Sequence, residues 1–472
     1  MFELHHLTAL EQLDWLRRGE VSPRDLTDHY LERIERLDSG LGAFVTVTPA
    51  EARARATAVD ALSHALPLWG LPFADKDLVA RAGVPTRYGS RAFADNVPTE
   101  SDELALVLDA AGGVSLGKTT APEFGFPSYT EPVAGPIARN PFDLARGAGG
   151  SSGGAAVAVA AGLLPFAPGS DGGGSIRIPA AATGLVGLKP SRGRVPAMPG
   201  FPSLAGLVVA GPLARTVADA ALLLDALVGD GSAQWATVAP DAGEGAFLGA
   251  AVRGEGRYSI GVTRDSPWAT AFDLELASEA EEAVQIALRE LDSIGHGIEE
   301  LAFDPEPGYA AAFRTVWQAG AAGIPVESDQ LDLVEPLTRW LVETGRGLGA
   351  RELGAALAWL VGFERRFIAR ASRVDVVLTP AMALTPRPLG WYDADDGERN
   401  FAQQVLYTPY TSMVNVSGLP AIVLPVHVTS DGLPMGVQLI GRPGREDVLL
   451  AIGAQLERRL HWERRHPPAW SA

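Results

Sequence analysis

The sequence predicts an α/β protein built as one large domain, and three observations support this. The chain has 472 residues, 47% of them hydrophobic, so it can bury a large core. Short apolar runs that predict strands alternate with helical patterns, as in a strand over 258–262, a helix over 278–291 and a strand over 298–301. No linker, repeat or low-complexity tail divides the chain. We therefore treat 1–472 as a single unit.

The first half of the chain predicts helices that lead into a series of short strands. Two helices are expected within 7–38, the second capped by Ser22 with Pro23 at its first position. Apolar residues then repeat at helical spacing. The elements expected next are a strand over 44–47, a helix over 51–62, a strand over 72–79, a helix over 102–111, a strand over 114–118, a helix over 155–162 and a strand over 163–168.

The second half predicts more helix, closed by a β-hairpin. Its expected elements are a helix starting within 180–183, a helix over 217–228, a variable loop over 229–254, mostly helix over 305–372, a strand over 374–378, a polar loop over 391–400, hairpin strands over 421–428 and 436–440, and a closing helix over 446–459. Asp431 and Gly432 supply the turn chemistry of that hairpin. The polar loop is a candidate lid over a site.

Composition excludes several classes of protein. The net charge of −18 argues against a nucleic-acid-binding surface, which needs a basic patch. The absence of cysteine excludes disulfides, thiolate metal sites and a cysteine nucleophile. The N-terminal segment has neither the basic start nor the apolar core of a secretory signal. The longest apolar runs, such as 155–166, are too short to cross a bilayer. We expect a cytoplasmic protein without a nucleic-acid or membrane partner.

Two glycine-rich serine clusters, at 147–154 and 169–175, flank a segment that predicts a helix. Glycine allows the backbone to approach a ligand closely. Consecutive N–H groups over 171–175 could therefore point at one spot and bind developing negative charge. Ser175, at the end of this run, is a candidate nucleophile.

A serine nucleophile needs a base, and Lys76 is the candidate that the sequence offers. None of the 8 histidines lies between residues 65 and 295, where the glycine-rich clusters occur. Lys76 follows Gly70 and Pro72 in the segment Gly-Leu-Pro-Phe-Ala-Asp-Lys-Asp. Most lysines are solvated surface residues, but a buried lysine can lose its proton and act as a base. Its setting and the serine clusters downstream favour this second interpretation.

Two other motif matches are rejected because their structural context is wrong. Residues 112–119 match the nucleotide-binding P-loop pattern letter for letter. A P-loop follows a strand and opens a helix, whereas here a helix is expected before it and Pro122 follows closely. Residues 149–153 contain Gly-x-Ser-x-Gly, but no hydrophobic strand is expected before them. A triad with that serine would also have to recruit His296 or His427, whose surroundings are ordinary.

Taken together, these segments resemble the amidase signature family. The match is carried by Lys76 and by the clusters at 149–154 and 169–177, with Ser151 and Ser175 separated by 175 − 151 = 24 residues. It extends over nearly the whole chain. The signature core would occupy about 65–220 and 374–460, and a variable, mostly helical pocket region about 225–372. Ala148, where members often have proline, and an additional glycine, Gly172, depart from the pattern.

The resemblance implies a fold, a mechanism and a set of site residues. The fold would be a central mixed, twisted sheet covered by helices on both faces. Ser175 would attack an amide carbonyl, and Ser151, with a cis peptide bond, would pass the proton to a neutral Lys76. The backbone N–H groups expected to form the oxyanion hole are those of Gly172, Gly173, Gly174 and Ser175. Ser170, Asp171 and Arg177 are interpreted as holding the loop by hydrogen bonds.

The predicted function is hydrolysis of small or medium amides through an acyl-enzyme, with anilides and carbamates among the candidates. We expect no cofactor and no metal, because no cluster has metal-ligand spacing along the sequence. Most aromatic residues of 305–372 should pack in the core, with one or two lining an apolar pocket. Two alternatives stay open: the A subunit of a glutamine-dependent aminoacyl-tRNA amidotransferase, and a non-catalytic binding protein with a degenerate site. The oligomeric state is also open, a homodimer being one option.

Overall fold

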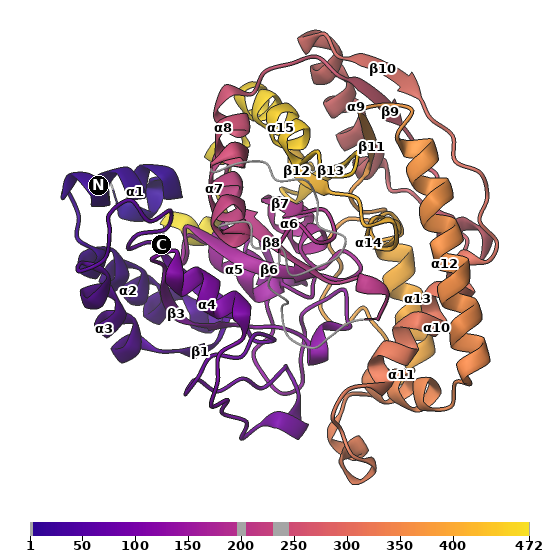
Figure 1. The fold of residues 1–472 in the computed structure, drawn as a ribbon, viewed down its shortest axis with the longest axis horizontal. Helices are drawn as coiled ribbons and strands as arrows, with labels where there is room; N and C mark the ends of the chain where they lie inside the picture. Colours follow the sequence, from indigo (N-terminus) through magenta and orange to yellow (C-terminus); the bar gives the residue numbers. More distant parts are fainter. Residues whose placement is uncertain (1–2, 196–203, 230–244, 472) are drawn as a thin grey trace.

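A computed structural model describes residues 3–195, 204–229 and 245–471, and a mixed sheet of eight strands runs through its centre (Figure 1). In spatial order its strands are β10 (Gly297–Glu300), β9 (Ser259–Val262), β11 (Val376–Pro380), β13 (Pro434–Gly441), β12 (Ala421–Val428), β7 (Val186–Lys189), β8 (Val209–Ala214) and β6 (Phe166–Asp171). Strands β10, β9 and β11 pair in parallel, and the other pairs are antiparallel. The prediction of a mixed sheet is confirmed.

A smaller sheet lies beside the first and carries Lys76. It contains β1 (Phe44–Val47), β3 (Val114–Thr119) and β2 (Pro72–Lys76), in that order. Strand β2 packs against β6, the edge strand of the larger sheet. Lys76 at the end of β2 is thereby brought to the end of β6, from which the second glycine cluster continues. A separate two-stranded sheet pairs β4 (Arg139–Asn140) with β5 (Asp143–Gly147).

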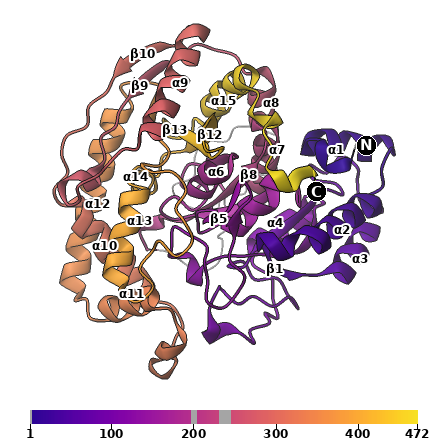
Figure 2. The same cartoon turned by 180° about the vertical axis from the view of Figure 1, so that it is seen from behind.

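Helices surround both sheets. Their bounds are α1 (Ala9–Arg18), α2 (Pro23–Leu41), α3 (Pro49–Val59), α4 (Glu103–Ala110), α5 (Gly153–Ala160), α6 (Arg177–Thr183), α7 (Val217–Val228), α8 (Ala246–Arg253), α9 (Ser278–Ile294), α10 (Tyr309–Ala322), α11 (Pro336–Arg346), α12 (Ala350–Ala371), α13 (Gly397–Tyr407), α14 (Ser412–Ser417) and α15 (Glu446–Leu460). Helices α1 to α3 form one end of the molecule, and α10 to α12 form the opposite end, as both cartoons show (Figures 1 and 2).

The central strands are covered on both faces. Every residue of β13 is buried, as are the first six of β12. Because successive side chains of a strand point to opposite faces, such continuous burial requires a helix layer on each side. Helices α7, α9 and α15 pack against the sheet, with α15 also in contact with both α7 and α9, while α6 packs against β7, β12 and β13. A second apolar cluster joins α10, α11 and α12 to the sheet.

Local sequence signals placed most boundaries correctly. Ser22 caps α2, with Pro23 at its first position, because the serine oxygen accepts the N–H of Asp25. The predicted strand over 258–262, helix over 278–291 and strand over 298–301 correspond to β9, α9 and β10. The predicted hairpin corresponds to β12 and β13.

Five predictions about local structure need correction. Helix α6 begins at Arg177 and ends at Thr183, so it ends where a helix start was expected. Helix α8 lies within the stretch expected to be a loop, of which residues 230–244 fall outside the described part of the chain. Strand β6 begins three residues later than expected and continues through Asp171, because it pairs with β8 along its whole length. Strand β5 precedes the first serine cluster, where no strand was expected, although its residues are mostly not buried. Helix α13 takes up the end of the predicted 391–400 loop.

Over the described ranges, we find no helix with the length and apolar character that crossing a membrane requires.

Candidate active site

Lys76 is a buried amine that contacts two serine hydroxyls. Its side chain is 2% exposed, and Nζ lies 2.8 Å from Ser151 Oγ and 3.0 Å from Ser170 Oγ. Burial lowers the pKa of Lys76 to about 7, although the Asp171 carboxylate acts in the opposite direction. Removal from water disfavours the charged form of an amine. Near neutral pH, a substantial fraction of Lys76 is therefore unprotonated and able to accept a proton.

Ser151 lies in a tightly packed turn in which the nearby residues Gly150 and Gly153 have no room for a side chain. The peptide bond between Gly150 and Ser151 is cis, as the family resemblance implies. A Cβ added at Gly150 would lie 2.5 Å from the Tyr129 carbonyl oxygen, and one at Gly153 would lie 2.4 Å from the hydroxyl of Thr130. Glycine is required at both positions because these neighbouring atoms leave no room for a Cβ. The packed turn positions the Ser151 hydroxyl against Lys76.

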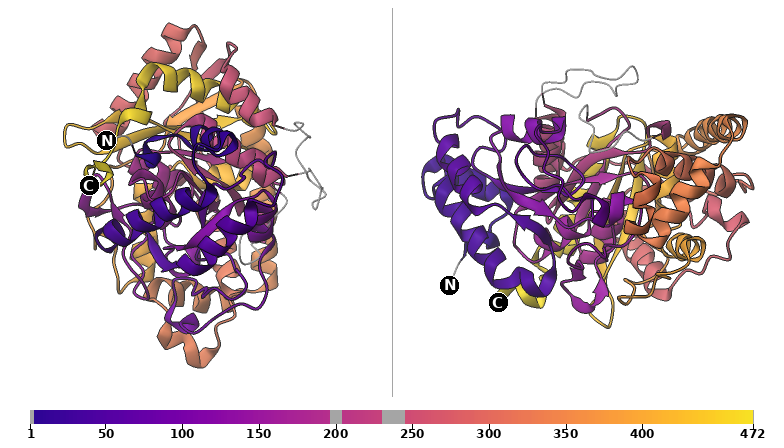
Figure 3. Two further views of the ribbon diagram at one scale, coloured as in Figure 1. Left: turned by 90° about the vertical axis from the view of Figure 1, so that its left-hand side faces the viewer. Right: turned by 90° about the horizontal axis from the view of Figure 1, so that it is seen from below.

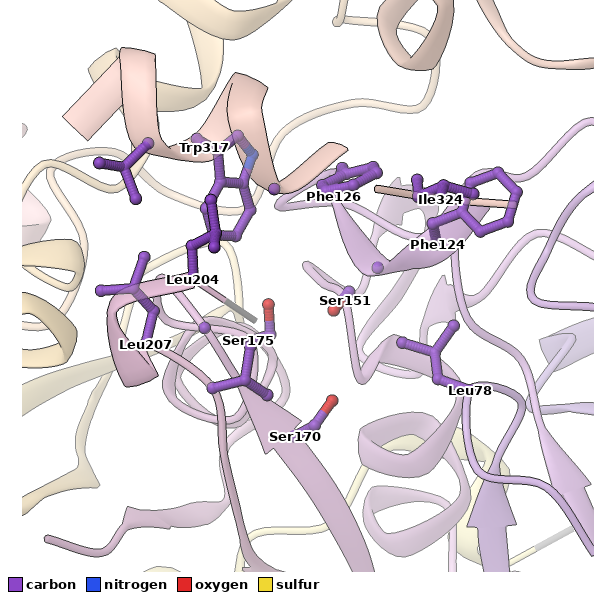
Figure 4. Close-up of a pocket in the computed structure, with 15 residues that line it drawn as sticks. Leu78, Phe124, Phe126, Ser151, Ser170, Ser175, Leu204, Leu207, Trp317 and Ile324 are labelled. Carbon is purple, nitrogen blue, oxygen red and sulfur yellow. The ribbon is translucent and has the colours of Figure 1, made fainter. Parts of the chain in front are cut away.

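Ser175 lies between β6 and α6, close to the first cluster. The N–H of Ser152 donates to the Ser175 carbonyl oxygen at 3.1 Å, which ties the two glycine-rich segments together. The hydroxyls of Ser151 and Ser175 converge on one space (Figure 4). No direct hydrogen bond joins the two hydroxyls in the described structure. Lys76, Ser151 and Ser175, predicted from separate parts of the sequence, thus come together.

Asp171 and Arg177 hold the second glycine loop, as predicted. Their side chains form a fully buried, two-pronged ion pair with both N–O distances at 2.9 Å. Asp171 also accepts the N–H of Gly174 at 2.8 Å and that of Ile176 at 3.2 Å. Burial opposes ionisation of Asp171, but the Arg177 guanidinium and these hydrogen bonds keep its pKa well below the usual range.

One of the four predicted oxyanion donors is consequently engaged inside the loop. The N–H of Gly174 points to Asp171 Oδ1, so it is not free to meet a ligand. The N–H groups of Gly172, Gly173 and Ser175 make no hydrogen bond to another described residue. Ser170 also differs from its interpretation as a loop-holding residue, because its hydroxyl accepts a hydrogen bond from Lys76.

An apolar pocket opens in front of the three serines (Figure 4). The apolar side chains that line it are Leu78, Phe124, Phe126, Leu204, Leu207, Val208, Val316, Trp317 and Ile324. No charged side chain is among the described residues of this lining. Trp317 was one of the aromatic residues considered from the sequence, and Phe313 lines an adjoining hollow that also reaches Ser175. The other lining residues were not predicted, because no sequence signal distinguishes an apolar residue that lines a pocket from one that packs in the core.

The rejected motif matches have structural explanations. Lys118, the lysine of the P-loop-like pattern, is fully buried and donates to the Val79 carbonyl and to Thr86 Oγ1. It follows no phosphate-binding turn. His296 contacts Gln455 at 2.7 Å, and His427 lies 3.4 Å from Glu282. Neither histidine lines the serine pocket, so a Ser-Asp-His arrangement at Ser151 has no support.

The expectation that no cluster has metal-ligand spacing is true along the sequence but not in space. Within the described ranges, Glu3, His5 and His29 place one ligand atom each within 4.8 Å of one another. None of the three lines the serine pocket. The sequence could not show this group because His29 is separated from the other two by a helix and a turn.

Comparisons with known proteins identify the family. A family model described as Amidase matches residues 25–450. The chain is 39% identical over 465 residues to the putative amidase AmiB2 of Mycobacterium tuberculosis (strain ATCC 25618 / H37Rv), with 97% of both chains covered. It is 33% identical over 487 residues to the A subunit of the glutamyl-tRNA(Gln) amidotransferase of Psychrobacter cryohalolentis, covering 96% of this chain and 95% of that one.

The solved structures agree. The structure of 6-aminohexanoate cyclic dimer hydrolase complexed with substrate matches with a TM-score of 0.89 at 30% identity, covering 99% of this chain and 100% of that chain. The chain therefore belongs to the amidase family, with the amidase signature fold. It is a hydrolase that acts on amide C–N bonds.

Proposed function

We propose that this protein hydrolyses small or medium uncharged amides with Ser175 as nucleophile, Ser151 as proton relay and Lys76 as base. The observation that carries the proposal is the 2.8 Å contact between Lys76 Nζ and Ser151 Oγ, made by a buried amine whose pKa is lowered to about 7. Activation of a serine requires a base that is unprotonated at working pH. Lys76 meets this condition.

In the proposed reaction, Ser175 Oγ attacks the amide carbonyl carbon while its proton passes to Ser151, whose own proton passes to Lys76. The tetrahedral oxyanion is bound by the N–H groups of Gly172, Gly173 and Ser175. Loss of one such donor typically raises the barrier by about 2.7–4 kcal/mol. The C–N bond then breaks, and the leaving amine takes a proton back along the same relay. Water attacks the ester of Ser175 and releases the acid.

The lining of the pocket supports an uncharged substrate. Trp317, Phe126 and their apolar neighbours provide area for an aliphatic or aromatic group, and no charged side chain among the described lining residues could pair with a charged one. Anilides, carbamates and cyclic amides fit this description. The proposal treats 1–472 as one functional unit and requires no nucleic-acid, membrane or protein partner.

The amidotransferase subunit is the second candidate, favoured by the 33% identity to the A subunit of a glutamyl-tRNA(Gln) amidotransferase. Such a protein would have to bind free glutamine, whose ammonium and carboxylate groups need charged or strongly polar partners. The apolar lining argues against this. Glutamine-dependent ammonia release that appears only with partner subunits would favour the second candidate over the first.

A substrate panel tests the proposal. The purified chain is assayed for amine or ammonia release from an anilide, a primary aliphatic amide, a carbamate, the 6-aminohexanoate cyclic dimer and glutamine. We include the cyclic dimer because a structural neighbour is named for hydrolysing it. We expect turnover of at least one uncharged amide without partners and none of glutamine.

Two variants and a probe test the residue assignments. Ser175→Ala should abolish turnover and labelling by a fluorophosphonate, with the melting temperature unchanged. Ser152→Ala is the matched control, because this neighbouring serine is buried but does not line the pocket. Wild-type-like turnover by Ser175→Ala would remove Ser175 from its role. A chain that neither turns over the panel nor reacts with the probe would favour the non-catalytic alternative.

A further inference from the structure

Three potential metal ligands meet at the end of the molecule where the termini lie side by side (Figures 1 and 3). Glu3 and His5 belong to the N-terminal segment around the short 3-10 helix η1 (Leu4–His6), and His29 belongs to α2. His5 Nδ1 lies 3.3 Å from Glu3 Oε2 and 3.3 Å from His29 Nε2. The group is separate from the serine pocket, whose lining contains none of these residues.

The hydrogen bonds around the two imidazoles define where their protons lie. His5 Nε2 is 3.2 Å from the Trp470 carbonyl oxygen, which can only accept, so Nε2 carries the proton and Nδ1 presents a lone pair. His29 Nε2 accepts the backbone N–H of His5 at 3.2 Å, so its single lone pair is already engaged and a metal ion bound there would replace this hydrogen bond. The lone pair of His5 Nδ1, in contrast, faces Glu3 Oε2 at 3.3 Å with no proton between the two atoms. A cation placed between these two atoms would relieve their repulsion.

We propose that Glu3 Oε2, His5 Nδ1 and His29 Nε2 form a binding site for a divalent transition-metal ion of the zinc class. Zn²⁺ binds imidazole nitrogen at about 2.0–2.1 Å in tetrahedral geometry, which places neighbouring ligand atoms about 3.3 Å apart. Both separations from His5 Nδ1 equal this value. Two imidazoles and one carboxylate suit Zn²⁺, Co²⁺ or Ni²⁺ rather than Ca²⁺ or Mg²⁺, which prefer oxygen ligands. Water would occupy the fourth position, because Glu3 is 44% exposed.

The neighbouring hydrogen bonds support and limit this site. The His5 Nε2–H bond to the Trp470 carbonyl is the kind of outer contact that orients a metal-bound imidazole. Arg33 acts against the metal, because its guanidinium lies 3.7 Å from Glu3 Oε2. Arg33 is also bonded to the carbonyl oxygens of Gly162, Ala161 and Trp470, so it stays in place when a metal binds. We therefore expect weaker binding than at a structural zinc site with four protein ligands.

Metal binding here would join three distant segments of the chain. It would link the N-terminal turn to α2 and, through the Trp470 carbonyl, to the C-terminal 3-10 helix η8 (Pro468–Ser471). An ion that binds only the folded state stabilises it by mass action. The site is thus expected to act on stability rather than on amide turnover.

The test is a metal titration of the untagged chain, residues 1–472, after chelation and dialysis. Zn²⁺ is followed by calorimetry and Co²⁺ by its visible absorption, whose intensity reports tetrahedral coordination. We expect one equivalent to bind and the melting temperature to rise. His29→Gln and Glu3→Gln should each weaken binding by about tenfold or more and remove the rise in melting temperature. Glu3 is half-exposed, so its variant tests the site even if His29→Gln unfolds.

His64→Gln is the matched control, because this exposed histidine stacks on Trp69 away from the cluster. It should bind both metals like the unaltered chain. The proposal is overturned if no equivalent binds. It is also overturned if Glu3→Gln binds as tightly as the unaltered chain, or if His64→Gln loses the metal.

Discussion

The sharpest test of the catalytic assignment is the pH dependence of kcat/KM. Burial lowers the pKa of Lys76 from 10.5 to about 7, which corresponds to roughly 5 kcal/mol against the charged amine. If the unprotonated amine is the base, the rate follows its neutral fraction. That fraction is about 9% at pH 6 and about 90% at pH 8 for a pKa near 7. We therefore expect kcat/KM to rise about tenfold from pH 6 to pH 8 and then to level off.

A lysine in open water would behave differently. With a pKa of 10.5, the rate would rise about 100-fold between pH 6 and pH 8 and about tenfold more by pH 9. The assay is amine release at substrate concentrations well below KM, in a buffer series of constant ionic strength. A rise that continues in proportion to hydroxide through pH 9 would refute the assignment of Lys76 as a buried base.

A second buried lysine supplies the control. Burial, together with the nearby Arg177, lowers the pKa of Lys189 to about 7 as well, so an inflection near pH 7 could belong to either residue. Lys189 donates to the Pro190 carbonyl at 2.8 Å and does not line the pocket. Lys189→Met should keep the inflection, whereas Lys76→Ala should lower the rate by about 10²–10⁴-fold and remove it. If Lys189→Met loses the inflection and Lys76→Ala keeps it, the inflection belongs to Lys189, and the assignment of Lys76 as the base is contradicted.

Four further predictions concern single groups. Ser170→Ala removes one of the two serine contacts of Lys76 and should lower kcat by about tenfold, a smaller loss than that caused by Ser151→Ala. Equal losses of kcat in the two variants, measured in stopped assays, would contradict the assignment of the relay to Ser151 alone. Trp317→Ala should raise KM for apolar amides about tenfold with a smaller change in kcat, and an unchanged KM would place the substrate elsewhere. Burial, with the adjacent Glu123 carboxyl, raises the pKa of Glu335 from 4.5 to about 7. Because the folded state binds this proton more tightly, the free energy of unfolding should fall as pH rises from about 4.5 to 7, and Glu335→Gln should reduce that fall by on the order of 1 kcal/mol in urea titrations. EDTA should leave amide turnover unchanged, because the proposed relay uses no metal. A loss of turnover that added metal restores would contradict this mechanism.

The residues proposed for catalysis could be found from the sequence because each lies in a local pattern with its own physical reason. The Tyr129 backbone at Gly150 and the Thr130 side chain at Gly153 leave no room for a Cβ, and the sequence shows such a constraint as glycine. Lys76 was selected by exclusion of histidine and by its flanking glycine and proline. The helix that begins after Ser22 was placed by its cap. These inferences need only short-range chemistry.

The direction of individual polar groups depends on residues far away in the chain. Gly174 donates to Asp171 because Arg177 orients that carboxylate, and Arg177 is itself bonded to Asn415 and Gln438. No pattern within the glycine loop contains this information. The wall of the pocket is a similar case, since its residues come from α10 and from separate loops that only packing brings to Ser175.

By itself, the sequence determined the α/β class, because caps and hydrophobic periodicity act over a few residues. It also determined the family and the three residues proposed to carry the reaction, through the resemblance of its lysine and glycine-rich serine segments to the amidase signature. Only the tertiary structure decided that Lys76 donates a hydrogen bond to Ser170 as well as to Ser151, and that the N–H of Gly174 donates to Asp171 within its own loop. It alone brought His29 to Glu3 and His5. Hydrogen-bond direction and burial are set by contacts between segments that lie far apart in the chain, and linear order does not encode these directly.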